Sequence, residues 1–106
     1  MFCRRRCCRS LQNGEITIDE LKNKVLQGAI LLDVRSKQEY REGHLRGAIN
    51  IPDFEIVNRV AKEITKKNQL IVLYCQYGGR SQNAMTIMKK LGYTNVYNLH
   101  GGLEML

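Results

Sequence analysis

The stretch with the clearest chemical potential is YCQYGGRS, residues 74–81, which carries a single cysteine. The apolar run at 70–74 predicts a buried strand, and Cys75 follows directly at its end. Two glycines, an arginine and a serine come next, and a helical period begins at Ser81. A thiol before a helix start is favoured as the thiolate by the positive end of the helix. The pattern therefore predicts that Cys75 is a nucleophile.

The rest of the loop has the residue types of an anion cradle. Backbone N–H groups of residues 76–80 can converge on one point if Gly78 and Gly79 adopt dihedrals that other residues avoid. Arg80 adds a permanent charge and a planar fork for an oxyanion. A helix terminus contributes only about 0.3–2 kcal/mol, so the N–H groups and Arg80 must supply the remainder. The expected anion-binding loop comprises Gln76, Tyr77, Gly78, Gly79, Arg80 and Ser81. The alternative is an inert, buried cysteine that closes a strand.

Strand and helix patterns alternate along the chain. Short apolar or extended stretches predict strands at 15–18, 29–34, 47–52, 70–74 and 95–99. Helical patterns lie between them, near 18–27, 37–42, 54–64 and 81–91. Two capping-box spacings, Thr17 with Glu20 and Ser36 with Glu39, precede the first two helices. Asp53 is a candidate cap for the third helix.

The third helix is expected to present one apolar stripe to the core. That stripe consists of Ile56, Val57, Val60, Ala61 and Ile64. The alternation as a whole predicts an α/β fold: a doubly wound, mainly parallel sheet of about five strands with helices on both faces. Sites in such sheets collect at the carboxyl ends of strands, where Cys75 and Asp33 are expected.

Length and charge indicate one domain with a basic tail. The chain has 106 residues and a net charge of +7, and residues 1–10 hold four arginines and no acid, so the other residues carry 7 − 4 = +3. We therefore expect a tail at 1–14 and a folded domain at 15–106. Such a tail can contact nucleic acid or an anionic surface, but charge confined to it does not predict a nucleic-acid-binding protein.

The cysteines do not predict a metal site or a disulfide within the domain. Three of the four, Cys3, Cys7 and Cys8, lie in the tail, and no second Cys/His cluster completes a zinc spacing. No apolar run is long enough to cross a bilayer, and no apolar segment follows the basic start as in a secretory signal. A reducing, cytoplasmic setting without membrane attachment is the expectation.

From about residue 15 to the end, the sequence resembles a single-domain rhodanese, a family of sulfurtransferases. The stretches LLDVRSKQEYREGHLRGAINIP and IVLYCQYGGRSQNAMTIMKKLGYTNVYNLHGG carry the resemblance. Their motifs occur in the family's order: Asp33–Arg35, Glu39–Tyr40, Gly43–His44, Gly47–Pro52, Cys75 with Gly78 and Arg80–Ser81, and Gly101–Gly102. Leu106 stands where the family usually has a tryptophan.

The resemblance implies transfer of sulfane sulfur through a persulfide on Cys75, with no metal and no organic cofactor. The donor would be a small molecule such as thiosulfate or a persulfide, and the acceptor cyanide in vitro or a thiol or protein in the cell. Arg80 would hold the donor's sulfonate oxygens. The sequence does not identify the physiological donor, the acceptor or the oligomeric state.

Two other functions remain open within the same fold. The first is a phosphatase or arsenate reductase: the dual-specificity phosphatases of the cell cycle share the rhodanese fold and place five residues between cysteine and arginine, whereas Cys75 and Arg80 enclose four. The shorter loop, and Tyr74 where those phosphatases have histidine, favour sulfur over phosphate. A non-catalytic rhodanese-like interaction module is the third reading, which the presence of Cys75 disfavours.

Other polar residues are expected to be mainly structural. Asp33 and Arg35 are supporting candidates near the pocket, with Arg35 paired to Glu39 or to a backbone carbonyl. His44, in a Gly-His turn, is expected to be a hydrogen-bonded structural histidine, and His100, before Gly101–Gly102, is not expected to be catalytic. Tyr77, at the loop apex, is expected to face solvent or substrate and to influence which acceptor docks.

Overall fold

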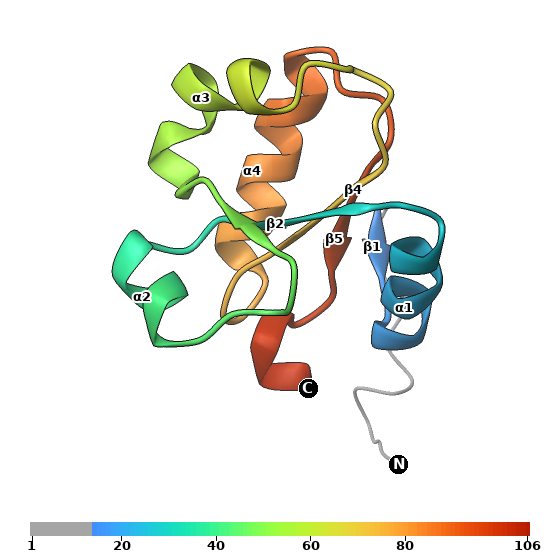
Figure 1. Cartoon of the computed structure of the whole chain (residues 1–106), viewed down its shortest axis with the longest axis vertical. Helices are drawn as coiled ribbons and strands as arrows, with labels where there is room; N and C mark the ends of the chain where they lie inside the picture. Colours follow the sequence, from blue (N-terminus) through green and yellow to red (C-terminus); the bar gives the residue numbers. More distant parts are fainter. Residues whose placement is uncertain (1–13) are drawn as a thin grey trace.

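Five parallel strands form one sheet in the computed structural model, which describes residues 14–106. The order across the sheet is β1-β5-β4-β2-β3 (Figure 1). The strands are β1 (Glu15–Ile16), β2 (Ile30–Asp33), β3 (Ile49–Asn50), β4 (Ile71–Tyr74) and β5 (Val96–Leu99). The predicted α/β fold is confirmed, whereas the expectations for the tail cysteines lie outside the described residues. No helix within 14–106 combines the length and apolarity that a membrane span needs.

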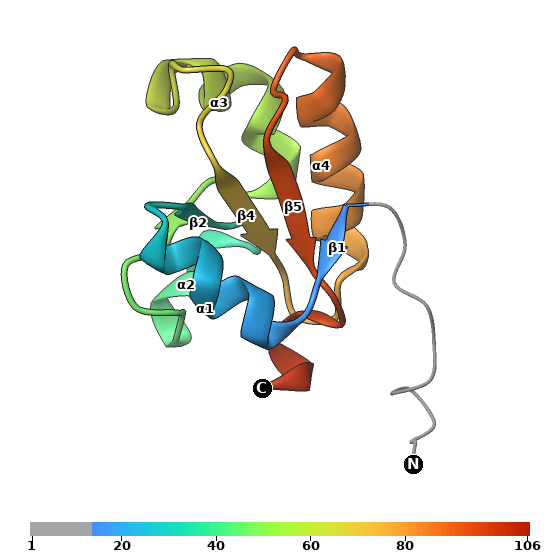
Figure 2. The same cartoon turned by 90° about the vertical axis from the view of Figure 1, so that its right-hand side faces the viewer.

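Helices cover both faces of this sheet. They are α1 (Ile18–Leu26), α2 (Lys37–Glu42), α3 (Ile56–Glu63) and α4 (Gly79–Lys90), with 3-10 turns η2 (Asp53–Glu55) and η3 (Gly102–Met105). Figure 2 shows α1 and α4 on opposite sides of the strands. Side chains of β4 alternate between the two cores: Val72 and Tyr74 pack toward α1, and Ile71 and Leu73 toward α3 and α4. A strand buried on both faces explains its continuous apolar sequence.

The two predicted capping boxes are both formed. Thr17 caps α1 and exchanges hydrogen bonds with Glu20, and Ser36 caps α2 and does the same with Glu39. In each case the hydroxyl accepts from the N3 backbone N–H, and the N3 carboxylate accepts from the cap's own N–H. The box at α2 fixes the position of the Glu39 side chain, which matters for the loop described below.

Helix α3 buries fewer of its apolar residues than the sequence predicts. Only Ile56 and Val60 of α3, with Ile64 after it, are buried, whereas Val57 and Ala61 are exposed. Apolar residues spaced by four form a narrow apolar stripe along the helix. Such a stripe is enough for a helix that contacts the core along a single line.

The starts of α3 and α4 also differ from those predicted from the sequence. Asp53 opens the η2 turn, and its carboxylate accepts from the N–H of Phe54 and not from the first turn of α3, so it does not cap α3. Helix α4 begins at Gly79, two residues earlier than predicted, because Gly78 turns the chain with a φ of +106°.

Strands β2 and β4 flank the point where the sheet changes winding direction. From β2 the chain continues outward to β3, and from β4 it continues to β5 on the other side. Asp33 is paired with Tyr74, and the N–H of Val34 donates to the Tyr74 carbonyl at 3.1 Å. Cys75 therefore leaves the sheet at the switch point, where α/β folds place their ligand sites.

The C-terminal η3 turn lies directly against the strand-to-helix loop. The N–H groups of Leu103 and Glu104 donate to the carbonyls of Cys75 and Gln76, each at 3.0 Å. Gly102 has a φ of +64°, and a Cβ at that position would lie 2.4 Å from the Cys75 carbonyl oxygen. The close approach of these two backbones therefore requires glycine at 102.

Gly102→Ala should lower the free energy of unfolding by about 2 kcal/mol or more, through a left-handed backbone and an overpacked contact. Gly28→Ala is the matched control, because Gly28 also has a positive φ, +93°, but open space around its Cβ position. Its cost should be about 1 kcal/mol. Urea unfolding of both variants measures the difference, and equal losses would contradict the proposed backbone clash.

Candidate active site

Cys75 sits at the end of β4 with its sulfur directed into the turn that leads to α4. Its Sγ accepts hydrogen bonds from the N–H of Gly78 at 3.0 Å and from the N–H of Ser81 at 3.4 Å. The residue is 1% exposed and is a free cysteine. Burial alone would also fit an inert cysteine, but two backbone donors converging on sulfur are the arrangement expected for an anion cradle.

Gly78 is the residue that makes this cradle possible. Its φ of +106° lies in the region that favours glycine, and a Cβ there would come within 3.3 Å of the Gly101 backbone nitrogen. Gly79, by contrast, is the first residue of α4, has no positive φ and has open space at its Cβ position. The expectation that both glycines adopt unusual dihedrals is thus right for Gly78 and wrong for Gly79.

The first turn of α4 contributes further free backbone donors to the loop. Since α4 begins at Gly79, the N–H groups of Gly79 and Arg80 have no carbonyl one turn earlier within the helix. Tyr77, at the apex, is 73% exposed, as predicted from its place in the loop. The loop thus has an inner row of backbone donors and a solvent-facing aromatic ring.

A buried polar cluster, which sequence reasoning missed, supports the loop from the β5 side. The Ser81 hydroxyl lies 3.4 Å from Cys75 Sγ and also within hydrogen-bonding distance of Asn98 Oδ1. Asn98 is fully buried, and its Nδ2 donates to Gln82 Oε1 at 3.0 Å and to the Gly78 carbonyl at 3.4 Å. The available signal was a polar residue in the apolar strand sequence NVYNL.

Arg80 pairs with Glu39 across the opening of the loop. Its two terminal nitrogens donate to the two carboxylate oxygens at 2.7 and 3.0 Å, with about a third of each side chain exposed. The hydrogen bonds from Arg80 are the main cause that lowers the pKa of Glu39 from 4.5 to about 2. Glu39 in turn raises the pKa of Arg80. The prediction that Glu39 pairs with Arg35 is therefore wrong.

Arg35 pairs instead with Asp33 in a buried network. The Asp33 carboxylate accepts from the Arg35 backbone N–H, from Nε and from a terminal nitrogen, the last at 2.8 Å. Arg35 also donates to the Gly43 carbonyl at 2.6 Å, as one of the two predicted options, and to Gln76 Oε1 at 3.3 Å. Hydrogen bonding to Asp33 is the main cause that raises the pKa of Arg35. Arg35 thus contacts the loop through the Gln76 side chain, which also donates to Glu104, whereas Asp33 holds Arg35 in place.

Two other sequence candidates have structural contacts. His44 stacks on Tyr40, with ring centroids 3.7 Å apart, and its Nδ1 lies 2.7 Å from the Tyr40 carbonyl oxygen. Tyr74 belongs to the α1-side core, where its hydroxyl accepts from the N–H of Leu45, and burial raises its pKa. Tyr74 therefore lies on the opposite face of β4 from the Cys75 side chain. Within residues 14–106, no group of three His, Cys, Asp or Glu side chains could hold a metal ion.

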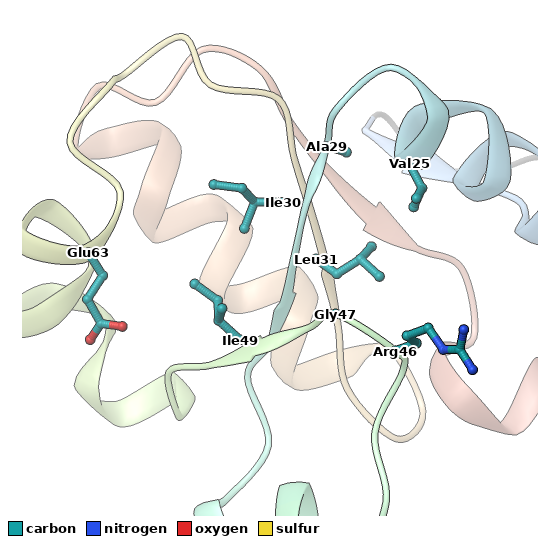
Figure 3. Close-up of a pocket in the computed structure, with 8 residues that line it drawn as sticks. All are labelled: Val25, Ala29, Ile30, Leu31, Arg46, Gly47, Ile49 and Glu63. Carbon is teal, nitrogen blue, oxygen red and sulfur yellow. The ribbon is translucent and has the colours of Figure 1, made fainter.

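A separate groove of about 380 Å³ lies between α1 and the β2–β3 edge and does not include the Cys75 loop (Figure 3). Its lining is mainly apolar, with one arginine and one glutamate. The residues are Val25, Ala29, Ile30, Leu31, Arg46, Gly47, Ile49 and Glu63. The candidate active site is instead the group of backbone N–H donors around the Cys75 sulfur.

Comparison with known proteins shows the family of this chain. The family model of the rhodanese-like domain matches residues 17–105, so the chain belongs to the rhodanese-like domain family. It is 41% identical over 73 residues to the thiosulfate sulfurtransferase PspE of Escherichia coli K12, covering 69% of each chain.

Solved structures show the same likeness. The human single-domain sulfurtransferase TSTD1 superposes with a TM-score of 0.78 at 28% identity, covering 89% of this chain and 95% of that one. An Escherichia coli rhodanese with anions superposes with a TM-score of 0.67 at 37% identity, covering 74% and 91%.

Asn98→Ala should cost about 1–3 kcal/mol of unfolding free energy, because it leaves the buried Ser81 hydroxyl and Gly78 carbonyl without their amide partner. It should also shift the amide resonance of Gly78. Asn95→Ala, on the same segment but with no side-chain hydrogen bond recorded within the described residues, is the control. A cost no larger than that of the control would contradict the supporting role of Asn98.

Glu39→Gln should destabilise the protein at pH 7 by up to about 1 kcal/mol, since solvent screens a pair that is one-third exposed. Because folding lowers the pKa of Glu39, the carboxylate contributes fully above pH 4.5, and its contribution falls as pH drops toward about 2. Unfolding in urea at pH 7 and pH 3 should therefore show a smaller difference from wild type at pH 3. If the variant differed from wild type by the same free energy at both pH values, the ion pair with Arg80 would not be the cause of the difference.

Proposed function

We propose that this chain is a sulfurtransferase that carries sulfane sulfur on Cys75. The observation that carries the proposal is the convergence of the Gly78 and Ser81 N–H groups on Cys75 Sγ at the start of α4. These donors stabilise negative charge on sulfur, which is the form that attacks. Relatives named as thiosulfate sulfurtransferases support this assignment.

The reaction has two displacement steps at sulfur. The Cys75 thiolate attacks the outer sulfur of a donor such as thiosulfate, the donor's S–S bond breaks, and sulfite leaves with the electron pair. The enzyme then holds Cys75–S–S⁻. An acceptor thiolate, or cyanide in vitro, attacks the outer sulfur and releases the Cys75 thiolate. Atoms and electrons balance across both steps, so neither a metal nor an organic cofactor is required.

The loop geometry suits the persulfide as well as the thiolate. An added sulfur extends about one S–S bond beyond Cys75 Sγ. In that position the N–H groups of Gly79 and Arg80, in the first turn of α4, are the candidate donors to it. Gln76 and Ser81 complete the loop: Gln76 through its contacts with Arg35 and Glu104, and Ser81 through its own N–H donor. A similar rhodanese from Escherichia coli was solved with anions, and the proposal places an anion at this loop.

Partners follow from the chemistry. The donor is a small molecule with sulfane sulfur, and the acceptor is a thiol or a protein that presents one. Tyr77, exposed beside the sulfur, is a candidate contact for a protein acceptor. A free reactive thiol suits a reducing compartment such as the cytoplasm, which we include in the proposal.

Phosphatase or arsenate reductase chemistry is the main enzymatic alternative. The four-residue spacing between Cys75 and Arg80 makes a loop one residue shorter than theirs. The Arg80 guanidinium is also already paired with a carboxylate. Both features disfavour a phosphate dianion in this loop.

After incubation with thiosulfate, intact-mass spectrometry of the full chain should show the mass of one added sulfur that a reductant removes. Cys75→Ser should lack this gain. The variant keeps Cys3, Cys7 and Cys8, so it also controls for nonspecific loading of tail thiols. Equal sulfur gain in the variant, or no gain in wild type with either thiosulfate or a thiosulfonate donor, would contradict the proposal. Hydrolysis of an aryl phosphate by wild type but not the variant would instead support phosphatase activity.

A further inference from the structure

The Arg80 guanidinium, which interacts electrostatically with Cys75, is already neutralised by a carboxylate. Arg80 donates from both terminal nitrogens to the two oxygens of Glu39, at 2.7 and 3.0 Å. This bidentate contact occupies two of the five N–H bonds of the guanidinium and leaves Nε–H and one hydrogen on each terminal nitrogen. Arg80 therefore keeps hydrogen-bond donors for a bound ligand, while the pair as a whole has no net charge.

Glu39 is held in place independently of Arg80. Its Oε1 accepts from the Ser36 backbone N–H at 3.0 Å, as the N3 member of the α2 capping box. The low pKa of the carboxyl keeps it ionised through the neutral and mildly acidic range. A ligand that competes for the charge of Arg80 must therefore displace a carboxylate fixed by its own helix.

Within residues 14–106, the other ionised groups that contact the loop or Arg80 do not add a net positive charge. Arg35 is paired with Asp33 at 2.8 Å, and both are buried. Asp53 also acts electrostatically on Arg80, and Glu104 accepts from the Gln76 side chain. The basic character of the whole chain comes largely from the four arginines of residues 1–10.

We propose that Glu39 is a specificity-determining residue that sets the charge preference of the sulfur donor. By neutralising Arg80, it favours donors with one negative charge or none over dianionic donors such as thiosulfate. This inference rests on the proposed sulfurtransferase function and concerns which donors load Cys75. The selected class comprises thiol persulfides and thiosulfonates, which carry the same outer sulfur with less charge than thiosulfate.

A matched pair of donors tests this preference. Thiosulfate is a dianion, and benzenethiosulfonate is a monoanion that transfers the same outer sulfur. In both reactions the Cys75 thiolate attacks that sulfur and the S–S bond breaks, with sulfite or benzenesulfinate leaving with the electron pair. In a two-step exchange, kcat/KM for the donor reports only this first half. The ratio of the two kcat/KM values therefore isolates the effect of donor charge.

Glu39→Gln should raise kcat/KM for thiosulfate about three- to tenfold, because the unpaired Arg80 charge then attracts the dianion across a partly solvated distance. The value for benzenethiosulfonate should rise less, so the ratio of the two shifts toward thiosulfate. Glutamine can still accept from the Ser36 N–H, so the capping box and the fold are retained. Glu42→Gln is the matched control, because it removes one charge from an exposed position on α2 that contacts Gln38 and not Arg80.

Three kinetic results would overturn the inference. One is an unchanged ratio in Glu39→Gln, and another is an equal loss with both donors, which would show that Glu39 only orients Arg80. The third is the same ratio shift in Glu42→Gln, which would show a general effect of net charge.

A binding measurement separates this inference from the proposed transfer. Sulfate, a dianion, is titrated into Cys75→Ser and Cys75→Ser/Glu39→Gln, with the amide resonances of Gly78 and Gly79 as the readout. The double variant should bind sulfate more tightly, by the same three- to tenfold factor expected from the lost carboxylate. Equal affinities would overturn the role of Glu39 even if Cys75 transfers sulfur. Failure of both donors to load wild type would instead contradict the proposed function, while the sulfate titration still decides the role of Glu39.

Discussion

The chain must pass from the end of β4 to the start of α4 within four residues, 75–78, while the Cys75 sulfur stays at the centre of the turn. The positive φ of Gly78 makes this possible, because it reverses the chain direction and aims the Gly78 N–H at Sγ. The same turn brings the first N–H groups of α4 to that point. Burial, donor placement and the electrostatic effect of the helix end on the sulfur all follow from this one backbone conformation.

Such a turn needs support from the neighbouring parts of the fold. Three parts of the fold supply it from different directions. The η3 backbone donates to the carbonyls of Cys75 and Gln76, and Asn98 on β5 bonds to both the Gly78 carbonyl and the Ser81 side chain. The Glu39 carboxylate, fixed by the α2 capping box, holds Arg80. The site is therefore a rigid backbone cradle with a charge-balanced entrance, which suits sulfur chemistry better than the capture of a phosphate dianion.

The features that could be predicted from the sequence are those encoded locally. The capping boxes depend on residues three apart, the buried strands on short apolar runs, and the cysteine loop on eight consecutive residues. The pairing of Arg80 with Glu39 joins residues 41 positions apart, and the Ser81–Asn98 contact joins residues 17 apart. Neither leaves a local pattern, because the sheet order decides which loops meet. Local reasoning therefore offers Arg35 either Glu39 or a backbone carbonyl, of which only the carbonyl is right, and treats Gly78 and Gly79 alike.

The most direct test of this account is a crystal structure of the protein after loading with a sulfur donor. The account predicts a second sulfur bonded to Cys75 Sγ, directed into the loop and within hydrogen-bonding distance of the N–H groups of Gly79 and Arg80. It also predicts that Gly78 keeps its positive φ and that the loop backbone does not move. A persulfide directed away from these donors, or a loop that opens to form it, would contradict the claim that the backbone cradle holds the transferred sulfur.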